Sequence, residues 1–154
     1  MKNNLLFEGV DTTGAMTETT DLLFVYGTLL GQSNSAMASF LKENSQIVEN
    51  GFFPGELYDL GDYPGAVFIA HAPTKVYGTI LKLTDWENTL AKLDEYEETG
   101  PGFVQPNEYL RKIIQVENLS GRFLNCWVYE YNYSTKNKTL IASGKYLKKG
   151  NEFA

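Results

Sequence analysis

A glutamate that continues the apolar face of a predicted helix is the residue best suited to acid–base chemistry. Winding at about 100° per residue puts Glu97 in a wedge of about 60° that also holds Trp86, Leu90 and Leu93. Ionised carboxylates are costly to bury, so this one is either hydrogen-bonded structurally or kept for chemistry. Burial and the partial negative charge of a helix C-terminus should raise its pKa, which suits a base that later acts as an acid. Alternatively, the helix frays at residues 99–102 and Glu97 turns into water.

A glycine loop after an apolar strand is the second candidate for chemistry. Residues 22–26 are consecutive apolar side chains, typical of a short central strand, and Gly27 follows them directly. A glycine lets the backbone turn sharply and approach a ligand, and successive amides after such a turn can bind an oxygen anion. Tyr26, Gly27, Thr28 and Leu29 are therefore candidate substrate-binding residues, unless the glycine simply ends the strand.

Tyr109 and Arg111 are further candidates, at the start of a strand predicted over residues 109–116. The alternation of a strand puts both side chains on one face. Arg111 can bind a substrate carboxylate through two parallel hydrogen bonds, or it can pair with Asp94. We favour the structural pairing, but both alternatives stay open.

Strands must position these residues, because strand patterns outnumber helix patterns. Besides 22–26 and 109–116, the predicted strands are 47–58, 66–70, 76–83 and 125–133, and the helices are about 35–44 and 85–97. Thr84 and Glu87 predict a capping box at the start of the second helix. Pro54 implies an edge or a bulge, and Gly78 a barrel bend, a bulge or a close backbone approach. These patterns predict an α+β domain whose mixed sheet curls into a small barrel with about two flanking helices.

Composition narrows the class of protein. The chain has 154 residues, enough for one domain with a real core. Its net charge of −6, without a basic stripe, argues against nucleic acid or an anionic membrane as a partner. The single cysteine, Cys126, excludes an internal disulfide and is expected to be buried; the single histidine, His71, excludes a multi-histidine metal site. We therefore expect no catalytic metal.

The chain divides into three segments by composition. Residues 1–21 are polar and are predicted to form a poorly ordered extension, residues 22–147 the domain, and residues 148–154 a frayed tail. No stretch reaches the length of a membrane span or a signal-peptide core. With no paired cysteines either, we expect a cytoplasmic location.

Several short motifs occur in a fixed order along the chain. They are FVYGTL at 24–29, GELYDLGDYPG at 55–65, LDEYE at 93–97, YLR at 109–111, and WVY at 127–129 with SGKY at 143–146. Together they resemble the gamma-glutamylcyclotransferase-like family, which includes AIG2-like and gamma-glutamylamine cyclotransferase proteins. Each motif alone is weak, but their ordered occurrence from residue 22 to residue 147 is hard to obtain by chance.

The resemblance implies the same barrel fold and a reaction without a cofactor. The α-amino group of a gamma-glutamyl compound attacks its own γ-carbonyl, forming 5-oxoproline and expelling an amine or amino acid. The family's pattern L-D-x-aromatic-E puts its catalytic glutamate at Glu97, and its Tyr-x-Arg falls on Tyr109 and Arg111. The loop amides would hold the glutamyl carboxylate or the oxyanion, with the Tyr26 side chain as a wall. The expected partner is thus a small gamma-glutamyl substrate; the oligomeric state stays open.

Two departures from the family leave the substrate open. Leu30-Gly31-Gln32 stands where relatives usually carry basic residues, and Glu98 stands where many have glycine or another small residue. A second acid beside Glu97 can alter its titration. A binding module without turnover would carry the same loop and the same glutamate. A structural interaction protein would instead have a filled, apolar barrel and no pocket.

Overall fold

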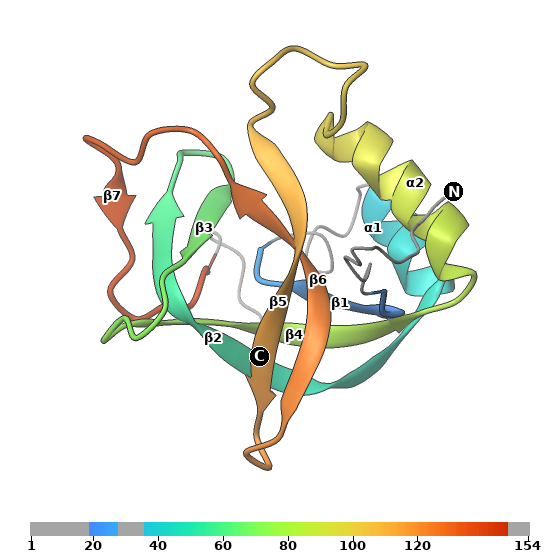
Figure 1. Cartoon of the computed structure of the whole chain (residues 1–154), viewed down its shortest axis with the longest axis horizontal. Helices are drawn as coiled ribbons and strands as arrows, with labels where there is room; N and C mark the ends of the chain where they lie inside the picture. The colour runs from blue at the N-terminus through green and yellow to red at the C-terminus, as the bar shows by residue number, and fades with distance from the viewer. Residues whose placement is uncertain (1–18, 28–35, 148–154) are drawn as a thin grey trace, which may run out of the picture.

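Seven strands and two helices make up the part of the chain described by the computed structural model, residues 19–27 and 36–147. In order they are β1 (Leu22–Val25), α1 (Ala36–Glu43), β2 (Ser45–Asp59), β3 (Pro64–Phe68), β4 (Lys75–Leu83), α2 (Trp86–Glu97), β5 (Tyr109–Asn118), β6 (Phe123–Tyr131) and β7 (Thr139–Leu140). Figure 1 shows both helices on one side of the strands. None of the helices in the described ranges is long and apolar enough to cross a membrane.

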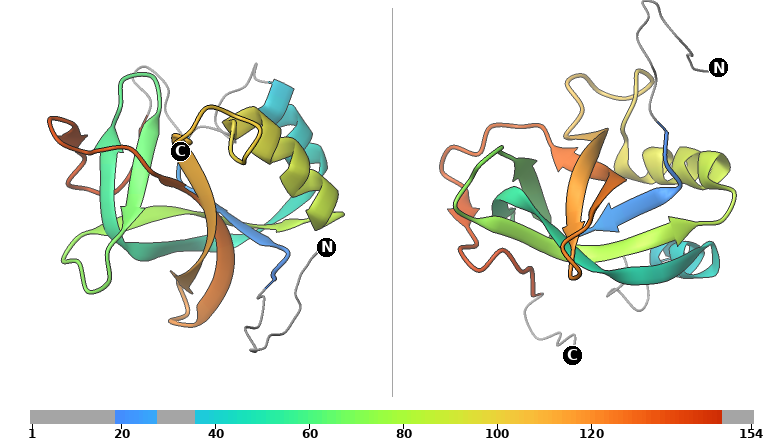
Figure 2. Two further views of the ribbon diagram at one scale, coloured as in Figure 1. Left: turned by 45° about the horizontal axis from the view of Figure 1, so that its top comes forward. Right: turned by 60° about the horizontal axis from the view of Figure 1, so that its bottom comes forward.

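Five of the strands close into a barrel. Pairing runs β2–β4–β1–β6–β5, and β5 pairs back onto β2. Only the β1–β6 contact is parallel, joining Leu23 to Trp127, and the other pairs are antiparallel. Figure 2 shows β1 lying between β4 and β6. The predicted α+β class, with a mixed sheet curled into a small barrel and two helices, is confirmed.

Strand β2 is the longest and changes partner along its length. It pairs with β4 as far as Pro54, opposite Lys75, and with β3 from Gly55 onward, opposite Phe68. Of the edge or bulge predicted at Pro54, the bulge is absent, because the strand passes through this residue without a register shift; the register shift lies earlier, between Ile47 and Glu49. A residue without an N–H group is tolerated where the strand passes from one partner to the next.

Two apolar clusters hold the domain together. The first contains buried residues of the strands alone, among them Phe24, Phe53 and Val128. The second joins the helices to the sheet through side chains such as Leu41 and Leu93. Cys126 belongs to the first cluster and is fully buried, as expected, and burial raises its thiol pKa to about 12. It is therefore a small apolar core residue.

Helix α2 begins where it was expected but not by the expected means. It starts at Trp86, one residue after the predicted start, yet Asp85 before it has a left-handed conformation and no side-chain cap hydrogen bond. The predicted capping box of Thr84 and Glu87 is therefore wrong. Instead the Thr89 hydroxyl donates to the Thr84 carbonyl at 2.7 Å, which ties the start of the helix to the residue that follows β4.

Gly78 marks a close approach between two strands. It pairs with Gly51 without a register shift, so the bulge considered from the sequence is absent at this position. A Cβ atom there would lie 2.3 Å from the Val25 carbonyl oxygen and 2.7 Å from the Phe24 ring. Glycine thus lets β4 lie directly against β1, the strand that leads into the cavity described next.

Candidate active site

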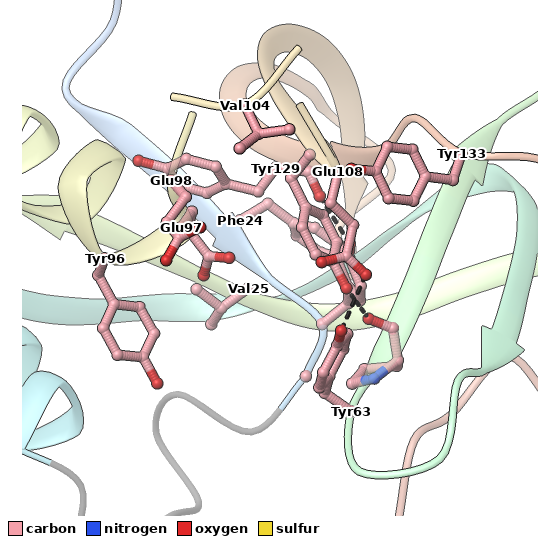
Figure 3. A pocket seen from close by; sticks show the side chains of 14 residues that line it. Phe24, Val25, Tyr63, Tyr96, Glu97, Glu98, Val104, Glu108, Tyr129 and Tyr133 are labelled. Carbon is pink, nitrogen blue, oxygen red and sulfur yellow. Dashed lines mark hydrogen bonds between the residues drawn. The ribbon is translucent and has the colours of Figure 1, made fainter. Parts of the chain in front are cut away.

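A cavity of about 490 Å³ opens where the end of β1 meets the end of α2. Figure 3 shows side chains from the strands, from α2 and from the segment before β5 around it. Its described lining residues are Phe24, Val25, Tyr26, Gly27, Tyr63, Pro64, Tyr96, Glu97, Glu98, Val104, Glu108, Tyr109, Tyr129 and Tyr133. A cavity of this size, lined by both polar and apolar groups, is typical of a small-molecule site. It does not fit the filled barrel of a structural interaction protein.

Glu97 reaches this cavity as the last residue of α2. Leu90 and Leu93 on the same stripe are buried, as the helical period predicts. Burial, followed by the negative charges of Glu108 and Asp94, raises the pKa of Glu97 to about 7. The sequence also predicted a raised pKa for Glu97. It pointed to Glu98 as the second acid, however, whereas the acids that contribute in the structure are Glu108 and Asp94.

The end of α2 is ordered, which removes the alternative that Glu97 turns into water. Glu98 caps the helix in a left-handed conformation, with its N–H donating to the Glu95 carbonyl at 3.1 Å. The Thr99 N–H then donates to the Asp94 carbonyl at 2.9 Å. These bonds satisfy the last helical carbonyls and fix the direction in which Glu97 points.

Tyr26 anchors the end of β1 through its hydroxyl group. The hydroxyl donates to the Tyr129 carbonyl at 2.6 Å and accepts the Ala66 N–H at 3.2 Å. Strand β1 is therefore tied to β6 and β3 beyond its last ladder pair, Val25 with Thr79. Burial raises the phenol pKa far above its ordinary value, so the hydroxyl stays protonated.

Gly27 lines the same cavity as Glu97. A Cβ atom on Gly27 would lie 2.9 Å from Cγ of Pro64, the first residue of β3. The backbone at Gly27 therefore lies closer to Pro64 than a residue with a side chain would allow. Thr28 and Leu29 lie outside the described residues. The anion site predicted at the amides of this loop therefore stays a prediction. Of the loop's residues after β1, Gly27 is described and lines the cavity.

Arg111 is directed to Asp94 and does not line the cavity. Its Nε and Nη2 atoms donate to the two Asp94 carboxylate oxygens at 2.8 and 2.9 Å. Its guanidinium also lies 4.3 Å from the centre of the Trp127 ring. Of the two alternatives, the structural pairing is the one present. Tyr109 does line the cavity, and its buried hydroxyl donates to the Pro64 carbonyl at 2.6 Å.

The cavity wall contains an acid–phenol pair that was not predicted from the sequence. The Tyr63 hydroxyl donates to Oε2 of Glu108 at 2.8 Å, and this bond raises the Tyr63 pKa to about 12. Glu108 is held in place by its neighbour Asn107, whose buried side chain accepts the Gly100 N–H at 2.8 Å and donates to the Val104 carbonyl at 3.1 Å. The motif around Tyr63 was a usable signal, whereas nothing in the sequence singled out Glu108.

Known proteins match the chain over nearly the whole domain. The family model described as gamma-glutamyl cyclotransferase, AIG2-like, matches residues 23–148. A gamma-glutamylcyclotransferase family protein, YtfP, from Citrobacter rodentium is 33% identical over 127 residues, which cover 81% of this chain and 94% of that protein.

Solved structures agree with the sequence match. The solution structure of YtfP from Escherichia coli is 30% identical, with a TM-score of 0.56 over 83% of this chain and 97% of that chain. The crystal structure of an AIG2-like protein from Mus musculus, at 24% identity, has a TM-score of 0.59 over 77% and 82% of the two chains and supports the fold alone. Because the family model covers the barrel and the relatives match over almost their full length, the chain belongs to the gamma-glutamyl cyclotransferase, AIG2-like family.

Proposed function

We propose that this protein is a cofactor-independent cyclotransferase that releases 5-oxoproline and an amine or amino acid from a gamma-glutamyl compound. The observation that carries the proposal is Glu97: a carboxylate in the wall of a small-molecule cavity, with its pKa raised to about 7. A group with such a pKa can both accept and return a proton near neutral pH. The family to which the chain belongs supports the reaction class.

The reaction moves two protons, one after the other, from the α-nitrogen to the leaving nitrogen and exchanges one C–N bond for another. Glu97 accepts a proton from the α-ammonium group of the substrate, and the freed nitrogen attacks the γ-carbonyl carbon. The new C–N bond closes a five-membered ring, and the original amide C–N bond breaks. Glu97 then returns its proton to the departing nitrogen, and the second proton that the ring nitrogen loses as it becomes a neutral amide passes to the same nitrogen, so the amine leaves as an ammonium. No water is consumed, so substrate and products have the same atoms.

The reaction needs two further features, confinement of the substrate and hydrogen-bond donors for its anionic groups. A flexible glutamyl chain must be folded so that its nitrogen meets its own carbonyl, and confinement in a fitted cavity reduces that entropic barrier. The oxyanion or the glutamyl carboxylate also needs donors, which the amides that begin at Gly27 would supply. Tyr26 stays protonated and holds the start of this loop against β3 and β6.

Direct measurement of 5-oxoproline tests the proposal. Purified protein is incubated with a panel of gamma-glutamyl amines, gamma-glutamyl amino acids and a gamma-glutamyl isopeptide, and 5-oxoproline is quantified over time. We expect at least one compound to be converted, with no requirement for an added metal ion. Tight binding without product would instead identify a binding module. Loss of turnover with a chelator and its return with a divalent ion would contradict the proposed mechanism.

A further inference from the structure

The cavity carries negative charge without a matching cation. Its described lining includes three glutamates, Glu97, Glu98 and Glu108, and six tyrosines, but no lysine, arginine or histidine. Within residues 19–27 and 36–147, no ion pair involves any of these three glutamates. The adjoining residues 28–35 also contain no basic residue in the sequence. A ligand group that fits here must therefore tolerate, or neutralise, several carboxylates.

Glu108 and two tyrosines form a separate end of this cavity. Figure 3 shows Glu97, the last residue of α2, and Glu98, its C-cap, on one side, while Glu108 lies between Tyr63 and Tyr133 on the other side. Tyr63 donates to Oε2 of Glu108, and among the described residues the second carboxylate oxygen, Oε1, has no donor, so it can accept from a ligand. The Tyr63 and Tyr133 side chains are each 41% exposed, so their rings are accessible. A carboxylate beside aromatic rings is an arrangement that binds ammonium groups.

We propose that this end, defined by Glu108, Tyr63 and Tyr133, is a leaving-group subsite selective for a positively charged amine. The inference rests on the proposed cyclotransferase function. The substrate class is a gamma-glutamyl derivative of a diamine or polyamine, with its glutamyl part at Glu97 and Gly27 and its distal ammonium at Glu108. Salt bridges and ring contacts to that ammonium select it over a neutral tail.

An amino acid as leaving group fits this end poorly. Its carboxylate would enter a cavity whose described charged groups are all glutamates, with no cation to pair with it. Like charges placed together select against such a ligand. The cyclisation itself is unchanged: the diamine leaves by cleavage of its amide C–N bond, Glu97 returns the proton to that nitrogen, and the distal ammonium keeps its charge throughout.

Three substrates that differ only at the far end of the leaving group test the subsite. They are the gamma-glutamyl amides of 1,4-diaminobutane, of n-pentylamine and of 4-aminobutyric acid, with a cationic, a neutral and an anionic tail respectively. We expect kcat/KM for 5-oxoproline release to be about tenfold higher for the cationic tail than for the neutral one, and lowest for the anionic one. Equal values, or a preference for the anionic tail, would overturn the proposal.

The Glu108→Gln variant assigns the selectivity to one residue. Glutamine can still accept the Tyr63 hydroxyl bond but carries no charge, so the cationic-to-neutral ratio of kcat/KM should fall to about one. Using this ratio removes any effect of Glu108 on the pKa of Glu97, because that effect is common to both substrates. The matched control, Glu95→Gln, changes an exposed acid outside the cavity and should keep the wild-type ratio. An unchanged ratio in Glu108→Gln would refute the assignment.

Binding measurements separate failure of this inference from failure of the proposed function. The same three compounds are titrated into the Glu97→Gln variant and their Kd values compared. If neither these compounds nor the wider panel of gamma-glutamyl compounds gives 5-oxoproline with the wild-type protein, the cyclotransferase proposal fails, while tighter binding of the cationic compound would still support the charge preference of the cavity. Equal affinities for all three would overturn the subsite whether or not turnover is seen.

Discussion

Arg111 binds both carboxylate oxygens of Asp94 and is not among the described residues that line the cavity with Glu97. The two hydrogen bonds measure 2.8 and 2.9 Å, and Asp94 also accepts the Tyr129 hydroxyl at 2.7 Å. Asp94 lies one helical turn before Glu97, and its charge helps to raise the pKa of that residue. The pair therefore orders the helix while leaving Glu97 without a cation among the described residues.

Replacing Glu97 with glutamine should abolish most of the cyclotransferase activity. Glutamine keeps the shape of the side chain but cannot accept the ammonium proton, so kcat should fall by at least ~10²-fold. The measurement is 5-oxoproline release at saturating substrate. Glu95→Gln, an exposed position on α2, is the control and should retain wild-type activity. A near wild-type rate in Glu97→Gln would mean that another group is the base.

The rate should also depend on pH in a way that follows Glu97. Its pKa is raised to about 7, and only the ionised form can accept the proton. We therefore expect kcat/KM to increase as the pH rises from 5 to 8, with the midpoint near 7. A profile of initial rates in buffers of constant ionic strength measures this. A flat profile over that range would be incompatible with Glu97 as the base.

The contribution of Glu97 to the stability of the fold should decrease as the pH rises, whereas the rate increases. The folded-state pKa of Glu97 is raised from 4.5 to about 7, so between these values the folded chain binds more protons than the unfolded chain. The contribution of Glu97 to the free energy of unfolding then falls as the pH rises through this window. Thermal melts of Glu97→Gln should match the wild type near pH 4.5 and show an equal or higher Tm at pH 8. A lower Tm at pH 8 would indicate a structural role for the carboxylate.

Breaking the Asp94 pair should destabilise the domain. Asp94→Asn removes the charge that Arg111 and Tyr129 bind, and both partners are partly buried, so we expect a loss of about 1–3 kcal/mol in the free energy of unfolding. Denaturant titration measures this loss. The control is Asp21→Asn, which breaks a 4.0 Å contact with exposed Lys82 and should have little effect. Equal stability of the two variants would show that the Arg111 pair contributes nothing.

Periodic segments were predictable from the sequence, and irregular ones were not. The stripe that contains Leu90, Leu93 and Glu97 repeats at the helical period, so its buried face and the position of the acid could be derived. Strand β7 has only two residues, Thr139 and Leu140, and exists because they pair with the end of β2. No local pattern can reveal so short a strand.

The candidate site was predictable only in part for the same reason. Glu97 and Gly27 follow a helix and a strand with clear patterns. Glu108 and Tyr63 come from connecting segments far apart in the sequence, and their hydrogen bond forms only when the barrel brings those segments together. The capping box failed because Asp85 takes a left-handed conformation, which residue types at the helix start do not reveal.

The position of β1 has a consequence for how the protein folds. This strand precedes all the other described strands, yet its neighbours are β4 and β6, which lie much later in the chain. Such long-range pairings form slowly, because the intervening chain must lose its freedom before the contacts stabilise it. Gly27 and Glu97 therefore come to line one cavity only through pairing of β1 with strands that are made much later in the chain.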